Sequence, residues 1–522
     1  MEQSRVLIAL VISLLIVVAY QKLVLSRYEP SRPTTAPQTP AAPEPTTRPL
    51  EERPLEEAKA PMGEFAAPVG EERPVEIETD VYRVAITPVG ARLTDIELKA
   101  YRRTVSADSP PLDLVQRGPV LPGTLALGVN SSDAALRYHP DRAQLVLHGS
   151  EQGDVSLAAD GPDGTRLQKR YRFTGDGYVF EVGATVSGAA AASSIGLVLT
   201  PVPVDSPHAR ETALAFTGHL VEKPATDLLK APIRIDSSAW AGFAAQYFLS
   251  AGLPASGVTT TVMTATDGTP IVRLDAPLAD GQAKFDVYAG PKDRETLHRA
   301  GHDLDRALDF GWFWFIAVPL LQALRFLYGI FGNYGVAIIV LTALVKLATT
   351  PLTQTTFRNM REMQKIQPQM AKLRERFKDD QVALQKEMME LYRRHRVNPF
   401  SGCLPMVLQL PIFVGLYNAL SHAIELRHAP FALWINDLSA PDRLMVGGVG
   451  VPVLTLFMGA SMFVQQWLTP QQGDPSQQRM MMFMPLVFTF MFINFPAGLV
   501  LYWLVNNVLT IGQQYLMMRS TK

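Results

Sequence analysis

The stretch from Tyr334 to Leu352 limits most how this chain can fold, because its 19 residues are apolar or uncharged except for Lys346. A run of this length is long enough to cross a bilayer as a helix. A lysine near the centre of such a span costs about 2.5–3.5 kcal/mol on insertion scales. Such a residue therefore normally has a function or reaches water with its charged end. A long, basic, amphipathic segment follows directly. Together the two features favour a membrane protein that handles other polypeptides.

The composition fits a polytopic membrane protein with a soluble portion. Of the 522 residues, 47% are hydrophobic and 19% are charged, and the net charge is −1. The net charge says nothing about nucleic acid, because the basic residues are concentrated locally, and no DNA partner is expected. The single cysteine, Cys403, excludes an intramolecular disulfide and a cysteine-based zinc site. The sequence contains no GxxxxGK[ST], HExxH or GxSxG motif. We therefore expect neither an enzyme nor a cofactor, although an intramembrane enzyme with scattered residues is not excluded.

The first 75 residues are predicted to form an anchor and a tether. Residues 1–28 contain an apolar run that fits either a cleaved signal peptide or a transmembrane signal anchor. The anchor is favoured because no small-x-small cleavage site follows closely. Residues 29–75 contain 11 prolines interspersed with Thr, Ala and Glu, which predicts a disordered tether.

Residues 76–300 are predicted to form a large β-sandwich domain, because short alternating runs recur between Gly, Pro and Asp turns. The FTGDGY stretch at 173–178 indicates a hairpin. The runs that predict strands most clearly are 81–87, 167–173, 178–186 and 284–290.

A metal site was weighed at the end of this region and set aside. His298 and His302 lie four residues apart, and on a helix the two could share a metal with Asp305. A solvated helix leading toward the membrane is the favoured interpretation, because such His pairs without a firm third ligand are common by chance. No metal is expected.

The remaining chain is predicted to form the membrane domain. Within 301–332, the aromatic segment 312–331 contains Pro319 and Arg325, and it fits either a span or an amphipathic helix in the interface. Residues 333–522 hold the Lys346 span and four further apolar segments: 403–420, 446–468, 480–495 and 497–516. As a helix, 480–495 rises only about 24 Å, less than the ~30 Å hydrocarbon thickness.

The charge of residues 356–398 predicts the orientation. This segment has 11 Lys/Arg and 6 Asp/Glu, so its net charge of +5 favours the cytoplasm. The C-terminus then also lies in the cytoplasm, and an interfacial 312–331 gives six spans, with the N-terminus inside and residues 29–333 outside.

Apolar residues at helical spacing predict a cytoplasmic helical hairpin. Its two stripes are Met360, Met363, Ile366, Met370, Leu373 and Phe377, then Leu384, Met388 and Leu391. We expect the stripes mainly to pack on each other, while their methionines leave room for an adaptable surface.

Lys346 is the central candidate site residue. A snorkelling lysine is the plain alternative, although helical Cα–Cβ bonds tilt toward the N-terminus, here the outer side, and so direct its stem deeper. Thr342 lies one turn earlier on the same face. Other polar residues in the spans, each explicable singly as an interhelical hydrogen-bonding group, together predict a water-filled groove: Gln409, Asn418, Gln465, Gln466, Asn506 and Asn507. A methionine cluster that includes Met481 and Met484 is interpreted as lipid-facing or as a sliding face for apolar clients.

Long motifs carry a family resemblance from about residue 310 to the end. They are PLT (351–353), VNPFSGCLPMVLQLPIFVGLY (397–417), ELRHAPFALWINDLSAPD (425–442) and NFPAGLVLYWLVNN (494–507). With these motifs, the chain resembles the Oxa/YidC family of membrane protein insertases, in the layout of its Gram-negative inner-membrane members. The resemblance implies an exported β-supersandwich for 76–300 and an interfacial helix for 312–331.

The resemblance also implies an intramembrane groove that opens to the cytoplasm and to lipid and carries one positive residue, commonly arginine. Lys346 occupies that place, Thr342 and Gln409 fall at groove-lining places, and Trp503 stands where relatives often have tyrosine. The lysine keeps the charge and loses the planar fork of arginine.

We therefore expect an insertase and chaperone for nascent or newly made membrane proteins. Clients would contact a groove lined by Lys346, Thr342, Gln409, Trp503 and Asn506, and slide along faces that carry Met406, Leu410, Met481 and Met484. The expected partners are the clients, the lipid bilayer, the Sec translocon through the family alone, and ribosomes through 356–398. A small-ion channel or transporter is the rival from another class, and a β-domain that binds sugars is a weaker one.

Overall fold

The computed structural model describes residues 73–519 except 117–123, 130–132, 162–163, 189–193, 204–210, 225–231, 256, 266–267, 379, 396–403 and 469–474. The anchor predicted at 1–28 and nearly all of the tether predicted at 29–75 lie outside the described residues.

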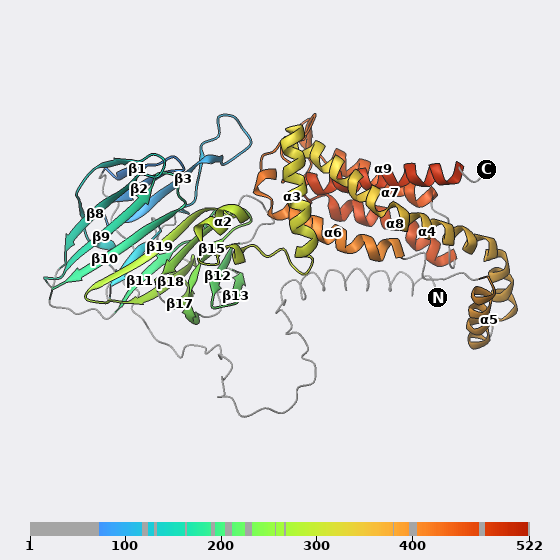
Figure 1. Cartoon of the computed structure of the whole chain (residues 1–522), viewed down its shortest axis with the longest axis horizontal. Coiled ribbons are helices and arrows are strands. Elements are labelled where there is room, and N and C mark those ends of the chain that lie inside the picture. The colour runs from blue at the N-terminus through green and yellow to red at the C-terminus, as the bar shows by residue number, and fades with distance from the viewer. Residues whose placement is uncertain are drawn as a thin grey trace, which may run out of the picture. The chain divides into compact units, whose positions relative to one another are not determined.

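Three sheets form the β-rich domain in the described residues between Val75 and Pro291 (Figure 1). The first has the order β4-β3-β2-β1-β7 and consists of β1 (Val75–Glu78), β2 (Tyr82–Thr87), β3 (Arg92–Arg102), β4 (Pro111–Asp113) and β7 (Gln144–Val146). The second has the order β13-β12-β15-β16-β19-β10-β9-β8-β6 and consists of β6 (His139–Pro140), β8 (Gln152–Asp160), β9 (Arg166–Thr174), β10 (Val179–Ser187), β12 (Thr212–Phe216), β13 (Leu220–Pro224), β15 (Trp240–Ala244), β16 (Phe248–Pro254) and β19 (Gln282–Pro291). The third has the order β14-β17-β18-β11-β5 and consists of β5 (Ala126–Val129), β11 (Ser194–Leu199), β14 (Ile233–Ser238), β17 (Val258–Thr264) and β18 (Pro270–Pro277).

The predicted strands are confirmed, and their alternation explains how the sheets share a core. The four predicted runs correspond to β2, β9, β10 and β19. β9 and β10 pair antiparallel on either side of the predicted hairpin turn. In β9 every second residue is buried, which is the period of a strand with one face in the core. Val84, Tyr171 and Leu197, one from each sheet, belong to the same buried cluster.

A buried ion pair interrupts the apolar face of β9. The Lys169 ammonium lies 2.5 Å from Oδ2 of Asp133, in the short 3-10 helix η1 (Asp133–Ala135), and both side chains are at most 5% exposed. Lys169 also donates to the Gly90 carbonyl at 2.6 Å, and the Tyr138 hydroxyl donates to Asp133 at 2.7 Å. Burial lowers the pKa of Lys169, while the Asp133 charge opposes that shift. The ion pair therefore links β9 to η1, and the Lys169 hydrogen bond to Gly90 links β9 to the turn between β2 and β3.

Removing one partner of this pair is expected to destabilise the β-rich domain strongly. Asp133→Asn leaves the Lys169 charge buried without a counter-ion, a change that typically costs about 3–5 kcal/mol. The matched control is Asp236→Asn, which breaks the half-exposed Arg234–Asp236 pair and should cost less than about 1 kcal/mol. Calorimetric unfolding of the detergent-solubilised protein measures both. Equal losses in the two variants would contradict the assigned role of the buried pair.

Helices form the rest of the described chain. They are α2 (Arg294–Ala300), η3 (Leu304–Ala307), α3 (Trp314–Phe331), α4 (Tyr334–Arg376), α5 (Gln381–Arg394), α6 (Leu404–His422), η5 (Ile424–Leu426), α7 (Val453–Leu468), α8 (Pro475–Phe492) and α9 (Ala497–Arg519), with a small hairpin of β20 (Leu444–Val446) and β21 (Val449–Val451) before α7. α3 packs against α4 and α6, and α9 packs against α4 and α7. In Figure 1, α4, α6, α7 and α9 lie side by side, and α3 runs across them near one end. By length and hydropathy, two helical stretches of the described chain could cross a membrane, Trp314–Phe331 and Tyr334–Pro351.

The predicted helical hairpin is present. α4 continues without a break from the Lys346 stretch into the first arm and ends at Arg376, and α5 forms the second arm. Met363, Ile366 and Met370 are buried, and Met388, Leu391 and Tyr392 pack against them. The two stripes therefore pack mainly on each other, as expected.

Two local predictions differ from the structure. The apolar segment predicted at 446–468 is helical from Val453 onward, because Gly447 and Gly448 both have positive φ and turn the chain into the β20–β21 hairpin. His298 and His302 do not share a helix, because α2 ends at Ala300 and Gly301 has φ 76°. In the described part of the chain, no group of three or more His, Cys, Asp or Glu side chains is arranged to hold a metal ion.

Candidate functional site

Lys346 lies on α4 and reaches α9. It is the thirteenth residue of α4, about 18 Å along the helix axis from Tyr334. Its half-buried ammonium donates to the hydroxyl of Thr510 at 2.7 Å, and Thr510 is itself 7% exposed. The Thr510 hydroxyl in turn donates to the Asn506 carbonyl at 2.6 Å. A cation inside the helical bundle is thus held by a chain of hydrogen bonds that ends on the α9 backbone.

Polar side chains of α9 also meet α4, α6 and α7. Gln409 of α6 donates its amide to the Tyr502 hydroxyl at 2.9 Å, and Asn507 donates to the Ser461 hydroxyl of α7 at 3.0 Å. One turn beyond Thr510, the Gln513 amide donates to the Thr350 hydroxyl of α4 at 3.3 Å. In these contacts α9 supplies one polar partner to each of the three helices.

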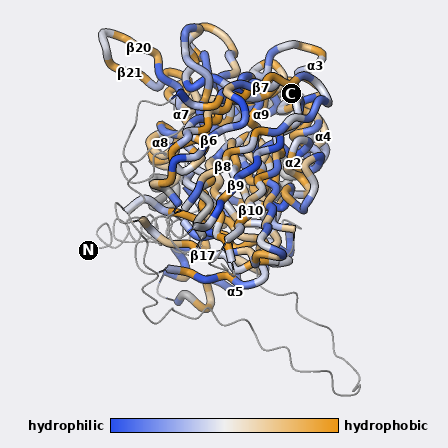
Figure 2. The backbone as a smooth tube through the Cα atoms, turned by 90° about the vertical axis from the view of Figure 1, so that its left-hand side faces the viewer, coloured by the Kyte–Doolittle hydropathy of each residue, from blue (hydrophilic) through white to orange (hydrophobic). Residues whose placement is uncertain are grey.

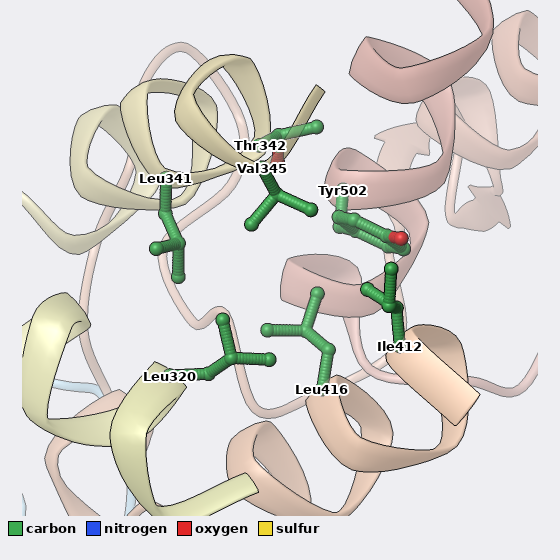
Figure 3. A pocket seen from close by; sticks show the side chains of 7 residues that line it. All are labelled: Leu320, Leu341, Thr342, Val345, Ile412, Leu416 and Tyr502. Atoms are coloured by element: carbon green, nitrogen blue, oxygen red, sulfur yellow. The ribbon is translucent and has the colours of Figure 1, made fainter. Parts of the chain in front are cut away.

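Thr342 lies on the buried side of α4, in a small apolar pocket. It is 3% exposed, and its hydroxyl donates to the Ile338 carbonyl of its own helix at 2.6 Å. Figure 3 shows side chains of four helices converging on this pocket, with Tyr502 at one side. The residues that line it are Leu320, Leu341, Thr342, Val345, Ile412, Leu416 and Tyr502. With its hydroxyl bonded to its own backbone, Thr342 here contributes shape more than polarity.

The other predicted groove residues have separate surroundings. Trp503 is half-buried in an aromatic cluster, where its ring centre lies 4.7 Å from that of Phe413 and 5.2 Å from that of Phe492. Asn506 is half-buried one turn before Thr510 and contributes the carbonyl described above. The structure thus brings Lys346 and Asn506 together through Thr510, while Trp503 belongs to the α6–α8–α9 packing.

The predicted sliding faces carry exposed apolar side chains. Leu410 on α6 is 58% exposed, and Met481 and Met484 on α8 are 39% and 44% exposed. Met406 lies in α6, and its side chain falls outside the described set. Phe490, also on α8, and Trp467 on α7 are exposed as well, at 79% and 78%. Apolar exposure of this extent is typical of a surface that faces lipid or an apolar partner.

The loop between α6 and α7 closes the end of the bundle where α4 and α9 begin. Ile435 and Leu438 are buried in the helical core. The Asn333 amide at the start of α4 donates to the Phe431 carbonyl, and the backbone N–H of Gly498 in α9 donates to the Leu438 carbonyl. This end is therefore covered by chain that is bonded to both helices.

Ion pairs between side chains hold α3 at the same end of the bundle. The Arg325 guanidinium bridges Asp293, which caps α2, and Glu425 of η5, at 2.6 and 2.5 Å. Burial alone would raise the pKa of Asp293, but the hydrogen bonds from Thr296 and the charge of Arg325 outweigh it and hold that pKa below its usual value. Two aromatic residues of α3 are more than 60% exposed: Trp314 at its first position and Phe326 in its second half.

Sequence reasoning missed the residues that partner the predicted ones. Tyr502, Thr510, Thr350, Ser461 and Gln513 were not singled out. A signal was available for part of this set, because Asn506, Thr510 and Gln513 recur at spacings of four and three and so share one face of a helix. Their partners on other helices follow from packing alone.

Thr510→Val is expected to weaken the bundle by removing the acceptor of Lys346. We expect a loss of about 1–2 kcal/mol in the free energy of unfolding. An average interhelical hydrogen bond in a membrane contributes ~0.6 kcal/mol, and a hydrogen bond to a charged group contributes ~1.5–3 kcal/mol. Thr510→Ser should restore most of it. Thr489→Val is the matched control, because the Thr489 hydroxyl bonds the Pro485 carbonyl within its own helix.

Unfolding in mixed micelles of increasing denaturing detergent measures these losses. In a double-mutant cycle with Lys346→Met, the effect of Thr510→Val should largely disappear. Additive losses from the two substitutions would show that the 2.7 Å contact carries no coupling energy.

Comparisons with known proteins cover nearly the whole chain. The family profile described as 60Kd inner membrane protein matches residues 326–522, and the profile described as YidC periplasmic domain matches residues 74–323. The membrane protein insertase YidC of Syntrophus aciditrophicus (strain SB) is 37% identical over 545 residues, with 98% of each chain covered. That of Oleidesulfovibrio alaskensis (strain G20) is 37% identical over 551 residues, with 100% of each chain covered. A solved structure of an active YidC insertase with its first transmembrane domain resolved has 20% identity and a TM-score of 0.39, covering 87% of this chain and 96% of that one.

Proposed function

The chain belongs to the YidC family of membrane protein insertases, and on this premise we propose how its own residues insert client proteins into the inner membrane. The family membership makes it a non-enzymatic insertase with a periplasmic domain and membrane helices. The proposal concerns its topology, the part played by Lys346, and the path of the client.

The proposed topology has six spans, with both termini in the cytoplasm. A signal anchor within 1–28 and five helices of 333–522 cross the bilayer, and residues 29–333 lie in the periplasm with α3 in the interface. The exposed aromatic residues of α3 and the ion pairs of Arg325 support an interfacial helix, since aromatic rings favour the headgroup region. The net charge of +5 in 356–398 supports a cytoplasmic α4–α5 hairpin.

The Lys346–Thr510 hydrogen bond is the observation that carries the proposed mechanism. A client's hydrophilic tail enters from the cytoplasmic side, where Lys346, Gln409 and the polar face of α9 replace part of its hydration. The ammonium is already partnered, so an acidic tail can bind it by exchanging with one neutral hydroxyl rather than by breaking an ion pair. The loop that covers the outer end makes the proposed groove a dead end, which holds the tail without opening a through-path for ions.

The client's apolar helix then moves along the exposed faces of α6 and α8. The apolar part of α8, Met481–Phe492, rises only about 18 Å, well below the ~30 Å hydrocarbon thickness. Thinning of the bilayer beside such a helix shortens the distance that the tail must cross. Burial of the client's apolar surface in lipid, at roughly 25 cal/mol per Å², drives release without nucleotide hydrolysis.

The proposal extends to partners and to the rival function. The α4–α5 hairpin receives clients, with ribosomes as one source, and the Sec translocon cooperates for larger clients. The net charge of +5 in 356–398 supports the first role; Lys365 and Arg394 are each 69% exposed at the side chain and pair with a glutamate of their own helix. A channel for small anions would need an opening at the end that the α6–α7 loop covers.

Lys346→Ala is expected to reduce insertion of a single-span client with an acidic exported tail by about tenfold or more, since a hydrogen bond to a charged group contributes about 1.5–3 kcal/mol. Lys346→Arg should insert almost as well as wild type, because it keeps the charge. Proteoliposomes that hold each variant and receive the same client measure this, with protease protection of the tail as the readout.

A client whose tail is neutral is the matched control, and Lys346→Ala should affect it much less. Insertion of the acidic client by Lys346→Ala at the wild-type rate would sink the proposed role of the ammonium and favour a snorkelling lysine. Ion conductance of empty proteoliposomes that depends on Lys346 would instead favour the channel.

A further inference from the structure

The β20–β21 hairpin is an apolar projection that the insertion mechanism does not use. Its eight residues, 444–451, read LMVGGVGV and contain no polar side chain. Met445, Val446 and Val449 are 65%, 58% and 66% exposed. Figure 2 shows the hairpin projecting, with hydrophobic residues in both strands. Contiguous apolar exposure of this kind marks a surface that meets a partner or a membrane.

The hairpin is built to hold this shape. Val446 pairs with Val449 across the turn, and both turn glycines adopt the positive φ that a two-residue turn requires. A Cβ atom added at Gly447 or Gly448 would meet no atom within 4 Å, so the tip stands clear of the described chain. A hairpin of two three-residue strands is not stable alone, and its shape therefore depends on its base.

The base of the hairpin is fixed on both sides. The buried Asp442 carboxylate accepts from the indole of Trp434 at 2.6 Å and from the backbone N–H of Leu454 at 2.5 Å, which ties the residue before the hairpin to the first turn of α7. Arg443 donates to the Ile493 carbonyl at 2.8 Å and to the Asn494 side chain at 3.0 Å, in the turn between α8 and α9. The apolar tip is therefore presented from a rigid end of the bundle.

We infer that the β20–β21 hairpin dips into the lipid headgroup region of the outer leaflet and anchors the outer end of α7 there. The occupant is lipid because the hairpin leads directly into the apolar helix α7, whose first two turns expose Leu456 and Phe457 at 51% and 57%. The surface also offers no charge or polar side chain with which a protein partner would be selected.

The depth of insertion follows from the backbone. A two-stranded sheet has two outer edges whose N–H and C=O groups must be satisfied, and hydrocarbon cannot satisfy them. The hairpin therefore lies at the interface, where water reaches its edges while Met445, Val446 and Val449 enter the boundary between headgroups and acyl chains.

The test uses the full chain without clients, so that it does not depend on insertion activity. In a Cys403→Ser background, Val446→Cys, Phe457→Cys and Val146→Cys are labelled with an environment-sensitive fluorophore. The protein is placed in vesicles of phosphatidylethanolamine and phosphatidylglycerol that contain nitroxide lipids. Val146 is the matched control, because it is a valine of a β-rich domain strand and is 46% exposed.

We expect the emission of the label at 446 to shift to the blue and to be quenched by nitroxide lipids. Shallow nitroxides should quench it more than deep ones, and the label at 146 should not change. If nitroxide lipids quench the label at 457 while iodide in the water quenches the label at 446, the hairpin lies in water. That result would overturn the inference and still leave α7 as a span. A label at 446 shielded from both lipid nitroxide and iodide would overturn it in favour of a protein partner. Failure of lipid quenching at both 446 and 457 would overturn it together with the proposed span of α7.

Discussion

The membrane domain depends on the cost of keeping one ammonium among apolar helices. Lys346 meets this cost with the Thr510 hydroxyl, which directs its own proton to the Asn506 carbonyl and so presents a lone pair to the lysine. Such a chain polarises each bond in the same direction and strengthens it. It also fixes the spacing of α4 and α9, because the bond cannot survive a turn of either helix. The polar contacts of α9 with Gln409 of α6 and Ser461 of α7 lie on the same helix.

The two ends of the bundle differ for reasons that lie in the loops. At one end, a buried carboxylate, an arginine and several backbone hydrogen bonds fasten the α6–α7 loop over the starts of α4 and α9. At the other, α4 runs on for more than six turns past Lys346 and folds back on α5 through an apolar seam. A cation that lies between a covered end and an extended hairpin is well placed to interact with a tail that enters from one side. Lysine offers that tail a point charge with three donors where arginine would offer a flat fork.

Much of the architecture could be predicted from the sequence, because the strands and the longer helices obey periods of two and 3.6. The sequence pattern predicts the strands at 82–87 and 179–187, the turn between β9 and β10, and both arms of the α4–α5 hairpin.

Lys346 could be singled out because it is a charge without charged neighbours in sequence. Its partner could not, since Thr510 lies 164 residues away and threonine is unremarkable in a helix. Thr342 shows a second limit, because spacing predicts its helix face but not that its hydroxyl bonds the Ile338 carbonyl of its own helix. The hairpin at 444–451 was absorbed into an apolar run, since hydropathy cannot distinguish a strand pair from the start of a helix.

The short apolar part of α8 links these features to the bilayer. A short helix in a thick membrane can slide, tilt or thin the lipid around it. Sliding is opposed here, because the α8–α9 turn is bonded to Arg443 and the bridge between Pro441 and Pro496 joins it to the same loop. Tilting is opposed by the aromatic packing of Phe488 and Phe492 on Trp503 of α9. With both motions restrained, the proposed mechanism assigns the mismatch to the lipid, as local thinning beside the exposed methionines of α8. The same bonds that close the outer end therefore place the thinned lipid next to the face along which a client would leave.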